Sequence, residues 1–438
     1  MNNIYIPVTV KFIFACIVAI CWTIFAIWFS LPWLSDLTYY FGAFLANFIL
    51  YGVAILPGFM NLFLMVSLLI DRRPKVMTLE GKYPPLTILI AAYNEEDSIM
   101  STLESISKQK YPGKIKAIVV NDGSTDKTAA VVRAAKKKYR WLTLVDLKKN
   151  GGKADALNKA VTHIETDLTV TIDGDSYLYK DALKNLVIRM LSDPPNTAAV
   201  AGAVMVRNSR ASLITRMQEW EYFHSIASIK RSQSLFQGTL VAQGAFSIYK
   251  TAAIIEAGGW KKCVGEDIVL TWAFLKNNHR VGYAENACLF TNAPTTIRQL
   301  AKQRVRWARG MIEAFKQHWQ LLFRPRMTTL FIWSNLTFPW IDFTFAFAMI
   351  PGIIAAFFGI FILAGPYTLL VIPLALLLNY IMFKIQSRMF NQQGLKVRRN
   401  ILGFIVFVLV YSFIMAPVCV YGYVKEAIFG NNKNWGTK

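Results

Sequence analysis

Long uncharged stretches flank a polar middle section of this chain on both sides. The first two, Phe12–Trp33 and Phe41–Ile70, each exceed the roughly 20 residues that a helix needs to cross the hydrocarbon of a bilayer. Three later candidates lie at Phe343–Leu363, Tyr367–Phe383 and Ile401–Tyr423. The pattern predicts a polytopic membrane protein with one large water-exposed domain between its transmembrane helices.

Composition agrees with this division. The mean hydropathy of +0.36, with 54% hydrophobic residues among 438, is too high for an ordinary soluble protein. We predict two transmembrane helices in residues 1–71, a soluble domain with interface helices in 72–325, and about three transmembrane segments in 326–438. Within the last part, Thr328–Ile341 contains Pro339 and two tryptophans, which is typical of a helix lying along the membrane interface.

Basic residues predict the orientation. The loop Leu34–Tyr40 has no Lys or Arg, whereas Asp71–Lys75 and Lys384–Arg399 are rich in them. Because basic loops stay on the cytoplasmic side, we expect a multi-pass protein of the bacterial inner or cell membrane with its central domain in the cytoplasm. Five spans would place the basic tail outside, so either the last segment folds back at Pro417 or the tail crosses despite its charge.

The net charge of +22 is explained by the same rule and by attraction to anionic membrane lipids, and we expect no nucleic-acid partner. The five cysteines form no Cys-x-x-Cys pair, which favours reduced, structural thiols over a zinc site or a disulfide framework.

The polar section alternates between predicted strands and helices. The strands are Leu86–Ala92, Ile115–Val120, Trp141–Leu147 and Leu168–Ile172, and the helices between them are Asp97–Lys108, Thr128–Lys138 and Ala154–Val161. This order predicts an α/β Rossmann-like domain with a mostly parallel sheet, whose ligand site lies at the carboxyl ends of the strands.

Acidic side chains follow three of these strands. Asp173 and Asp175 come after the fourth, at a spacing that lets two carboxylates hold Mg²⁺ or Mn²⁺ against a diphosphate. Asp-x-Asp alone is a weak signal, because turns are rich in Asp and Gly. Asp122, after the second strand, is either a helix cap or a ligand for a base or ribose. Glu95 follows the first strand and is a further candidate for substrate binding.

Three later groups complete the candidate site. Lys153, behind two glycines, is either a solvated turn residue or a phosphate ligand. Glu266 and Asp267 precede a helix, where they either complement its dipole or remove a proton from an attacking hydroxyl. The basic helix Thr295–His318 suits an anionic lipid surface, but it also offers Arg306 to a leaving diphosphate and Trp307 as a platform for a sugar ring.

Together these motifs resemble the processive family 2 glycosyltransferases, which include cellulose, chitin, hyaluronan and poly-β-1,6-N-acetylglucosamine synthases. The matching motifs are Val120–Ser124, Asp173-x-Asp175, Glu266-Asp267 and Gln303-x-x-Arg306-Trp307. The bacterial poly-N-acetylglucosamine synthases look nearest, through two N-terminal spans, the stretch Ile229–Gln233 and Gln303–Ala308. The resemblance implies a GT-A fold and an inverting transfer from a UDP-sugar to a growing polysaccharide, which the spans carry across the membrane.

The resemblance also implies residue roles. Glu266 and Asp267 would be catalytic, with Asp267 as the general base, and Asp175 with Asp173 would hold the metal. The substrate-binding residues would be Asp122 for the uridine, Lys153 and Arg306 for the diphosphate, Gly244 and Trp307 for the acceptor, with Glu95, Asp173 and Gln303 beside them.

Two positions depart from the family pattern. Gly265 stands where N-acetylglucosamine synthases usually have Thr, and Gln243-Gly244 stands where many relatives have Ser-Gly. Hyaluronan-, chitin- or glucan-type synthesis therefore stays open, as do single transfer to a lipid phosphate and a non-enzymatic scaffold. Regulation and an auxiliary membrane or export subunit lie outside what the sequence predicts.

Overall fold

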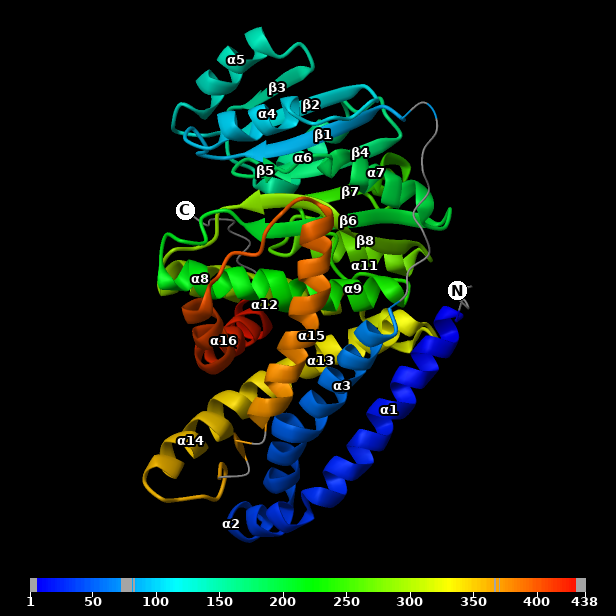
Figure 1. Ribbon diagram of the computed structural model, residues 1–438. Coiled ribbons are helices and arrows are strands. Elements are labelled where there is room, and N and C mark those ends of the chain that lie inside the picture. The colour runs from blue at the N-terminus through cyan, green and yellow to red at the C-terminus, as the bar shows by residue number, and fades with distance from the viewer. Residues whose placement is uncertain (1–5, 72–80, 82, 366–367, 370, 431–438) are drawn as a thin grey trace.

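An eight-stranded sheet forms the centre of the polar section (Figure 1). The computed structural model describes residues 6–71, 81, 83–365, 368–369 and 371–430. The strand order is β3-β2-β1-β4-β7-β6-β8-β5. The strands are β1 (Leu86–Ala92), β2 (Ile115–Asp122), β3 (Leu142–Leu147), β4 (Leu168–Asp173), β5 (Tyr177–Leu178), β6 (Thr197–Val206), β7 (Phe246–Lys250) and β8 (Arg280–Thr291).

The sheet is mixed but, as predicted, mostly parallel: four of its seven strand pairings are parallel, among them that of β6 with β8. Strands β3, β2, β1 and β4 run parallel, as predicted for 86–172, but β7 pairs antiparallel with both β4 and β6. The prediction did not extend to these later strands. In the parallel half, Ala92 is level with Asn121, and Ala91 with Asp173. The carboxyl ends of β1, β2 and β4 therefore meet at one edge.

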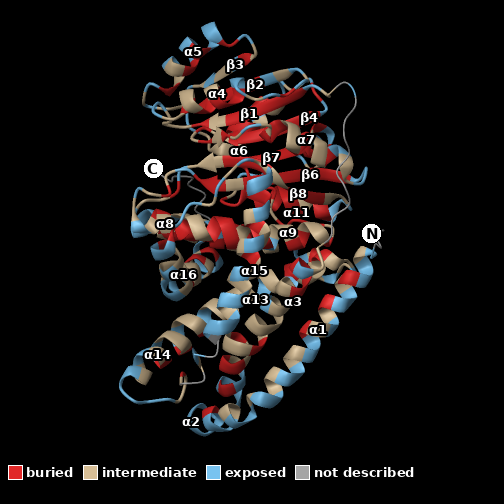
Figure 2. Cartoon of the chain, in the orientation of Figure 1, coloured by how far each residue is buried: buried red, intermediate tan, exposed pale blue. Residues whose placement is uncertain are grey.

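Helices cover both faces of the sheet, and the strands between them are buried (Figure 2). Leu89 of β1 packs with one core and its neighbours Ile88 and Ile90 with the other, as the alternation of a strand requires. One core includes residues of α4 (Ile99–Ser107), α5 (Thr128–Lys138) and α7 (Ala182–Ser192). The other includes residues of α6 (Lys153–Val161), α10 (Thr251–Glu256) and α11 (Glu266–Lys276).

A layer of helices separates the sheet from the long apolar helices (Figure 1). One part is a continuous run of α8 (Leu213–Trp220), η2 (Glu221–Ile226) and α9 (Ala227–Leu235). The other is α12 (Ile297–His318), followed by η3 (Trp319–Phe323). This layer places the Gln303–Trp307 motif between the sheet domain and the apolar part of the chain.

The apolar part is made of long helices whose side chains are largely exposed (Figure 2). In the described part of the chain, four segments are long and apolar enough to cross a membrane, and at most 33% of any apolar window is buried. These are α1 (Val8–Phe29), Leu31–Leu69, Met327–Phe357 and α16 (Ile401–Phe429). Leu31–Leu69 contains α2 (Leu31–Leu50), η1 (Tyr51–Ile55) and α3 (Leu56–Leu69), and Met327–Phe357 contains α13 (Met327–Thr344), η4 (Phe345–Met349) and α14 (Ile350–Phe357).

Three details of the predicted spans are wrong. Leu34–Tyr40 is not a loop but part of α2, which begins after Ser30 with Pro32 in its first turn and is kinked at Gly42, where φ is +75°. Thr328–Ile341 is not a separate interface helix, because the helix continues through Pro339 into the next apolar stretch. The Asp71–Lys75 cluster lies mostly outside the described residues.

The third difference concerns α15 (Val371–Gln392), whose predicted span Tyr367–Phe383 begins outside the described residues. The helix continues well into the predicted loop Lys384–Arg399, because Met389 and Phe390 pack against Phe223 and Tyr283 of the sheet domain. The last helix, α16, runs through Pro417 without folding back. All five cysteines are free, as predicted.

Candidate active site

Asp122 holds the loop that leads to Lys153. It ends β2 with only 1% of its surface exposed, and its two carboxylate oxygens accept the N–H groups of Gly151 at 2.9 Å and Gly152 at 2.8 Å. The loop turns through Gly152 at φ +92°, a conformation that favours glycine. Asp122 therefore fixes the backbone immediately before Lys153.

Lys153 begins α6 and points into a cluster of carboxylates. Its Nζ donates to Asp173 Oδ1 at 2.5 Å and lies 3.8 Å from Glu266 Oε1, and its side chain is 12% exposed. Burial acts to lower the pKa of Lys153, but Asp173, Glu266 and Asp267 outweigh it and raise that pKa above its ordinary value. The residue is therefore a permanent cation at the strand edge, suited to an anionic ligand.

The Asp173-Gly174-Asp175 turn follows β4 beside Glu95. Thr102 Oγ1 donates to the backbone O of Gly174 at 2.8 Å, and Thr291 Oγ1 donates to Asp175 Oδ1 at 3.2 Å. A methyl group on Gly174 would lie 3.1 Å from Cγ of Glu95, so the turn packs directly on the segment after β1. These contacts hold both aspartates at the edge where the parallel strands end.

The donor set of this turn fits a hard divalent cation. Asp173 and Asp175 are both partly exposed and supply carboxylate oxygens, the ligand type that Mg²⁺ and Mn²⁺ prefer. Within the described residues, no three His, Cys, Asp or Glu side chains gather into a metal-binding group. A cation here would take its other ligands from a diphosphate and water, which is how proteins usually hold Mg²⁺.

Glu266 and Asp267 open α11 and differ in exposure. Asp267 is partly exposed; its Oδ2 accepts the N–H of Gly244 at 3.2 Å and its Oδ1 that of Ile268 at 2.8 Å. Glu266 is 6% exposed. Burial raises the pKa of Glu266 to about 7, with Lys153 opposing the rise and Asp267 adding to it. Asp267 is therefore the member of the pair better placed to receive a proton from a bound hydroxyl.

Helix α12 brings the last predicted group to the same site. The positive charge of Arg306 lies close enough to Glu266 to favour the ionised form of that carboxyl. Trp307 is 43% exposed, and its ring lies 3.8 Å from the guanidinium carbon of Arg304. Gln303 Oε1 is buried and makes no hydrogen bond. The ring of Trp307 is thus partly exposed to solvent, and it makes a cation–π contact with Arg304.

The structure brings part of the predicted set into direct contact. Contacts link Lys153, Asp173, Glu266, Gly244 and Asp267, and Glu95 packs beside Gly174. The charge of Arg306 acts on Glu266, and Gln303 and Trp307 lie on the same helix, α12. Asp122 contributes through the Gly151–Gly152 loop and not by direct contact with the carboxylates.

Sequence reasoning missed Glu313. This buried residue of α12 accepts the N–H groups of Val264 at 3.1 Å and Gly265 at 2.8 Å, immediately before the catalytic candidates Glu266 and Asp267. A signal was present, because Glu313 follows Arg306 by two helical turns and so lies on the same face of α12. One helix therefore carries the Gln303–Trp307 motif and also holds the loop before α11.

A buried ion pair behind Trp307 was also missed. Arg304 donates to Glu221 of η2 at 2.6 Å, and Glu221 accepts the hydroxyl of Tyr411 of α16 at 2.6 Å. Arg304 is 3% exposed and Glu221 4%. These two bonds connect three helices, although their residues are more than 80 positions apart in sequence.

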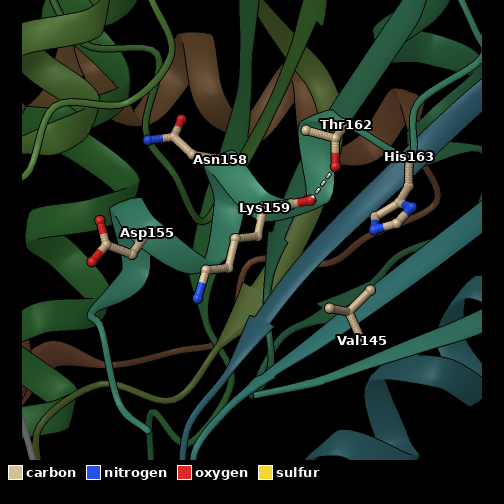
Figure 3. Close-up of a pocket in the computed structure, with 6 residues that line it drawn as sticks. All are labelled: Val145, Asp155, Asn158, Lys159, Thr162 and His163. Atoms are coloured by element: carbon tan, nitrogen blue, oxygen red, sulfur yellow. Dashed lines mark hydrogen bonds between the residues drawn. The ribbon is translucent and has the colours of Figure 1, made fainter. Parts of the chain in front are cut away.

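A hollow elsewhere on the domain takes no part in this site. It lies between β3 and α6 and is lined by Val145, Asp155, Asn158, Lys159, Thr162 and His163 (Figure 3). Asp155, Asn158 and Lys159 belong to the part of α6 beyond Lys153, and none of the predicted site residues lines the hollow.

Comparison with known proteins decides the family. The model of "Glycosyltransferase like family 2" matches residues 84–310, which is more than half of the chain and includes every motif of the cluster. The chain is a family 2 glycosyltransferase. The fold agrees with this assignment: a mannosyltransferase of Pyrobaculum calidifontis, solved with GDP-Man and Mn²⁺, aligns with a TM-score of 0.58 at 20% identity, covering 85% of this chain and 95% of that one.

Among curated relatives, this glycosyltransferase is similar to poly-β-1,6-N-acetyl-D-glucosamine synthases. The Staphylococcus aureus protein is 34% identical over 244 residues, or 55% of this chain and 57% of the relative. The Staphylococcus epidermidis protein is 33% identical over 248 residues, or 56% and 59%. The match thus spans a little over half the length of these relatives.

Proposed function

We propose that this glycosyltransferase is a membrane-embedded processive enzyme that polymerises a UDP-sugar into an exopolysaccharide and carries the polymer across the bacterial cell membrane. UDP-N-acetylglucosamine is the proposed donor, because the staphylococcal relatives that the chain resembles are poly-β-1,6-N-acetyl-D-glucosamine synthases. The central domain would face the cytoplasm. The four apolar segments support a multi-pass arrangement, with membrane lipids as partners.

The observation that carries the proposal is the setting of Asp267. A partly exposed carboxylate is fixed by two N–H groups beside a buried cation and a pair of aspartates. In the proposed step, Asp267 takes the proton of the acceptor hydroxyl while that oxygen forms a bond to the anomeric carbon. The bond from this carbon to the diphosphate breaks, its electron pair leaves with UDP, and an α-linked donor gives a β-linked product.

The other residues bind and orient. Lys153 and Arg306 would neutralise the diphosphate, Asp122 and Glu95 would border the nucleotide, and Gly244, Gln303 and Trp307 would hold the acceptor. Asp175, with Asp173, would hold Mg²⁺ or Mn²⁺, which supplies positive charge beside the departing diphosphate. The solved mannosyltransferase of similar fold contains Mn²⁺. The apolar helices would line the route of the polymer, because a hydrophilic chain does not cross lipid unaided.

The test is to offer the purified full chain a panel of UDP-sugars and to measure both UDP release and product length. We expect UDP-N-acetylglucosamine to give the fastest UDP release and a long polymer. A long polymer from a different UDP-sugar would reassign the donor to a hyaluronan-, chitin- or glucan-type reaction. A short lipid-linked product would contradict processive synthesis. If no UDP-sugar led to UDP release, the proposed transfer from a UDP-sugar would be wrong.

A further inference from the structure

Lys230 of α9 contacts the loop before β7. Its hydrogen bonds go to residues other than those proposed to bind substrate. Its Nζ donates to the backbone O of Val241 at 2.6 Å and also to Oε1 of Gln243. Burial lowers the pKa of Lys230 to about 7, and the charge of Asp267 opposes this change. Lys230 therefore lies close enough to the candidate base for the two charges to interact.

Gln243 connects Lys230 to the sheet through hydrogen bonds. Its Nε2 donates to the backbone O of Gly202 in β6 at 2.6 Å and lies 3.3 Å from the backbone O of Phe246 in β7. With Lys230 on its Oε1, the amide is bonded on both sides. A serine, which many relatives have here, is too short to join α9 and β6 in this way.

Gly244, the next residue, contacts the candidate base itself. Its N–H donates to Asp267 Oδ2 at 3.2 Å. A methyl group on Gly244 would lie 2.8 Å from Lys153 Nζ, so the backbone here fits closely between the base and the phosphate-binding cation. A displacement of the loop by a fraction of an ångström would therefore change how Asp267 is held.

Helix α9 is itself well anchored. Arg231, adjacent to Lys230, donates to Asp71 at the end of α3 at 2.5 Å and also pairs with Glu285 of β8. The helix that carries Lys230 is thus joined to both the first apolar hairpin and the sheet. The backbone of α9 at Lys230 is therefore held in place on two sides.

We propose that Lys230 is a positioning residue for sugar transfer: through Gln243 it fixes the Gly244 loop, whose N–H orients the carboxylate of Asp267. This role rests on the proposed function, in which Asp267 is the general base.

The main test compares Lys230→Met with Lys136→Met, a matched control on the exposed face of α5. Lys230→Met should lower kcat for transfer from UDP-N-acetylglucosamine by about tenfold or more, the scale expected for a misplaced catalytic group. The donor KM and the calorimetric affinity for UDP should stay within about twofold of wild type, because the variant keeps the residues that bind the donor. Lys136→Met should match wild type in all three.

Further variants separate positioning from general support of the fold. Lys230→Arg keeps donors at this point and should recover part of kcat. Gln243→Ser should lower kcat like Lys230→Met, and the double variant Lys230→Met/Gln243→Ser should be little worse than either, because the two changes break the same chain of contacts. If Lys230→Met does not fold, Gln243→Ser and Lys230→Arg give the decisive comparison.

Some outcomes would overturn the proposal. A folded Lys230→Met with wild-type kcat, or a Gln243→Ser with wild-type kcat, would show that neither residue positions the base. Parallel loss of UDP affinity and kcat would show a role in binding instead. The wild-type measurement tests the proposed function separately. If the wild-type protein bound UDP-N-acetylglucosamine but transferred no sugar, the proposed function would be wrong, whatever the Lys230 variants did.

Discussion

Gly265 and Gly310 meet backbone to backbone where the loop before α11 crosses α12. A methyl group on Gly265 would lie 2.5 Å from Cα of Gly310, and one on Gly310 would lie 2.7 Å from Cα of Gly265. Both distances are far inside van der Waals contact between carbon atoms. The contact gives a structural reason for glycine at both positions.

Gly310→Ala should therefore destabilise the protein. In an unobstructed helix this change stabilises by up to ~1 kcal/mol. Here the new methyl group pushes α12 away from Gly265 and loosens the hydrogen bonds of Glu313 to the loop before Asp267. We expect a lower thermal midpoint and slower sugar transfer, measured by thermal unfolding and UDP release. A raised midpoint with normal turnover would contradict the close contact.

Asp267→Asn should separate catalysis from binding. The amide keeps the shape of the carboxylate but takes up a proton poorly, so transfer should fall by a factor of ~10² or more. Calorimetric affinity for UDP should remain near that of wild type. The matched control is Glu266→Gln, at the buried neighbour. Near-normal turnover in Asp267→Asn together with an inactive Glu266→Gln would assign the base to Glu266.

Glu266 should make stability depend on pH. Its pKa is raised by burial to about 7 from an ordinary value of 4.5, so between these values the folded state binds more protons than the unfolded state. The contribution of Glu266 to the free energy of unfolding therefore falls as pH rises from about 4.5 to 7. Glu266→Gln should gain in thermal midpoint relative to wild type between pH 5 and pH 8. A constant difference between the two proteins would count against the shift.

Chelation should stop turnover if Asp175 and Asp173 hold a cation against the diphosphate. We expect EDTA to abolish UDP release and Mg²⁺ or Mn²⁺ to restore it. Asp175→Asn should weaken both UDP binding and catalysis, because the ligand loses its charge while keeping its shape. Asp155→Asn, on an acidic residue that pairs with Lys262 away from the turn, is the matched control. Full activity in excess chelator would exclude the metal.

Trp307→Ala should shorten the product more than it weakens donor binding. A stacked aromatic contact is worth on the order of 1 kcal/mol beyond its buried area, and a processive enzyme uses it after every addition. Arg306→Ala should instead weaken UDP binding, since it removes a cation facing the diphosphate. Polymer length on a gel and UDP affinity by calorimetry give the two readouts. Unchanged polymer length in Trp307→Ala would leave α12 with no part in processivity.

The parallel half of the sheet was predictable because each of its strands is a short apolar run closed by polar residues. The predicted bounds of β1 match the structure, and β2 extends two residues further to Asp122. The closeness of Lys153 to Asp173 and Glu266 also agrees with the site that the motifs predicted. These features depend on local sequence periodicity and on the ends of parallel strands meeting at one edge.

The remaining features depend on contacts between distant segments. Nothing local to Lys230 indicates that it meets Gln243, and β7 is antiparallel because of where the chain returns after α9. In the apolar helices a local signal is ambiguous: Pro339 and two tryptophans predict a separate interface helix, whereas the helix continues through Pro339 into the next apolar stretch. Packing against Phe223 likewise extended α15 beyond its apolar part.

The unbroken helix α16 bears on how this enzyme can be divided. Its Glu426 pairs with Arg309 of α12 at 3.0 Å and with Lys316 at 3.2 Å, and its Tyr411 bonds Glu221, the partner of Arg304. A fragment ending near residue 325 would keep these cations but lose Glu426 and Tyr411, and with them the buried ion pair and hydrogen bond that join α16 to α12 and η2. The catalytic unit suited to expression or inhibitor screening therefore includes the last helix, and a soluble piece cut at the apparent domain boundary would be a poor substitute for it.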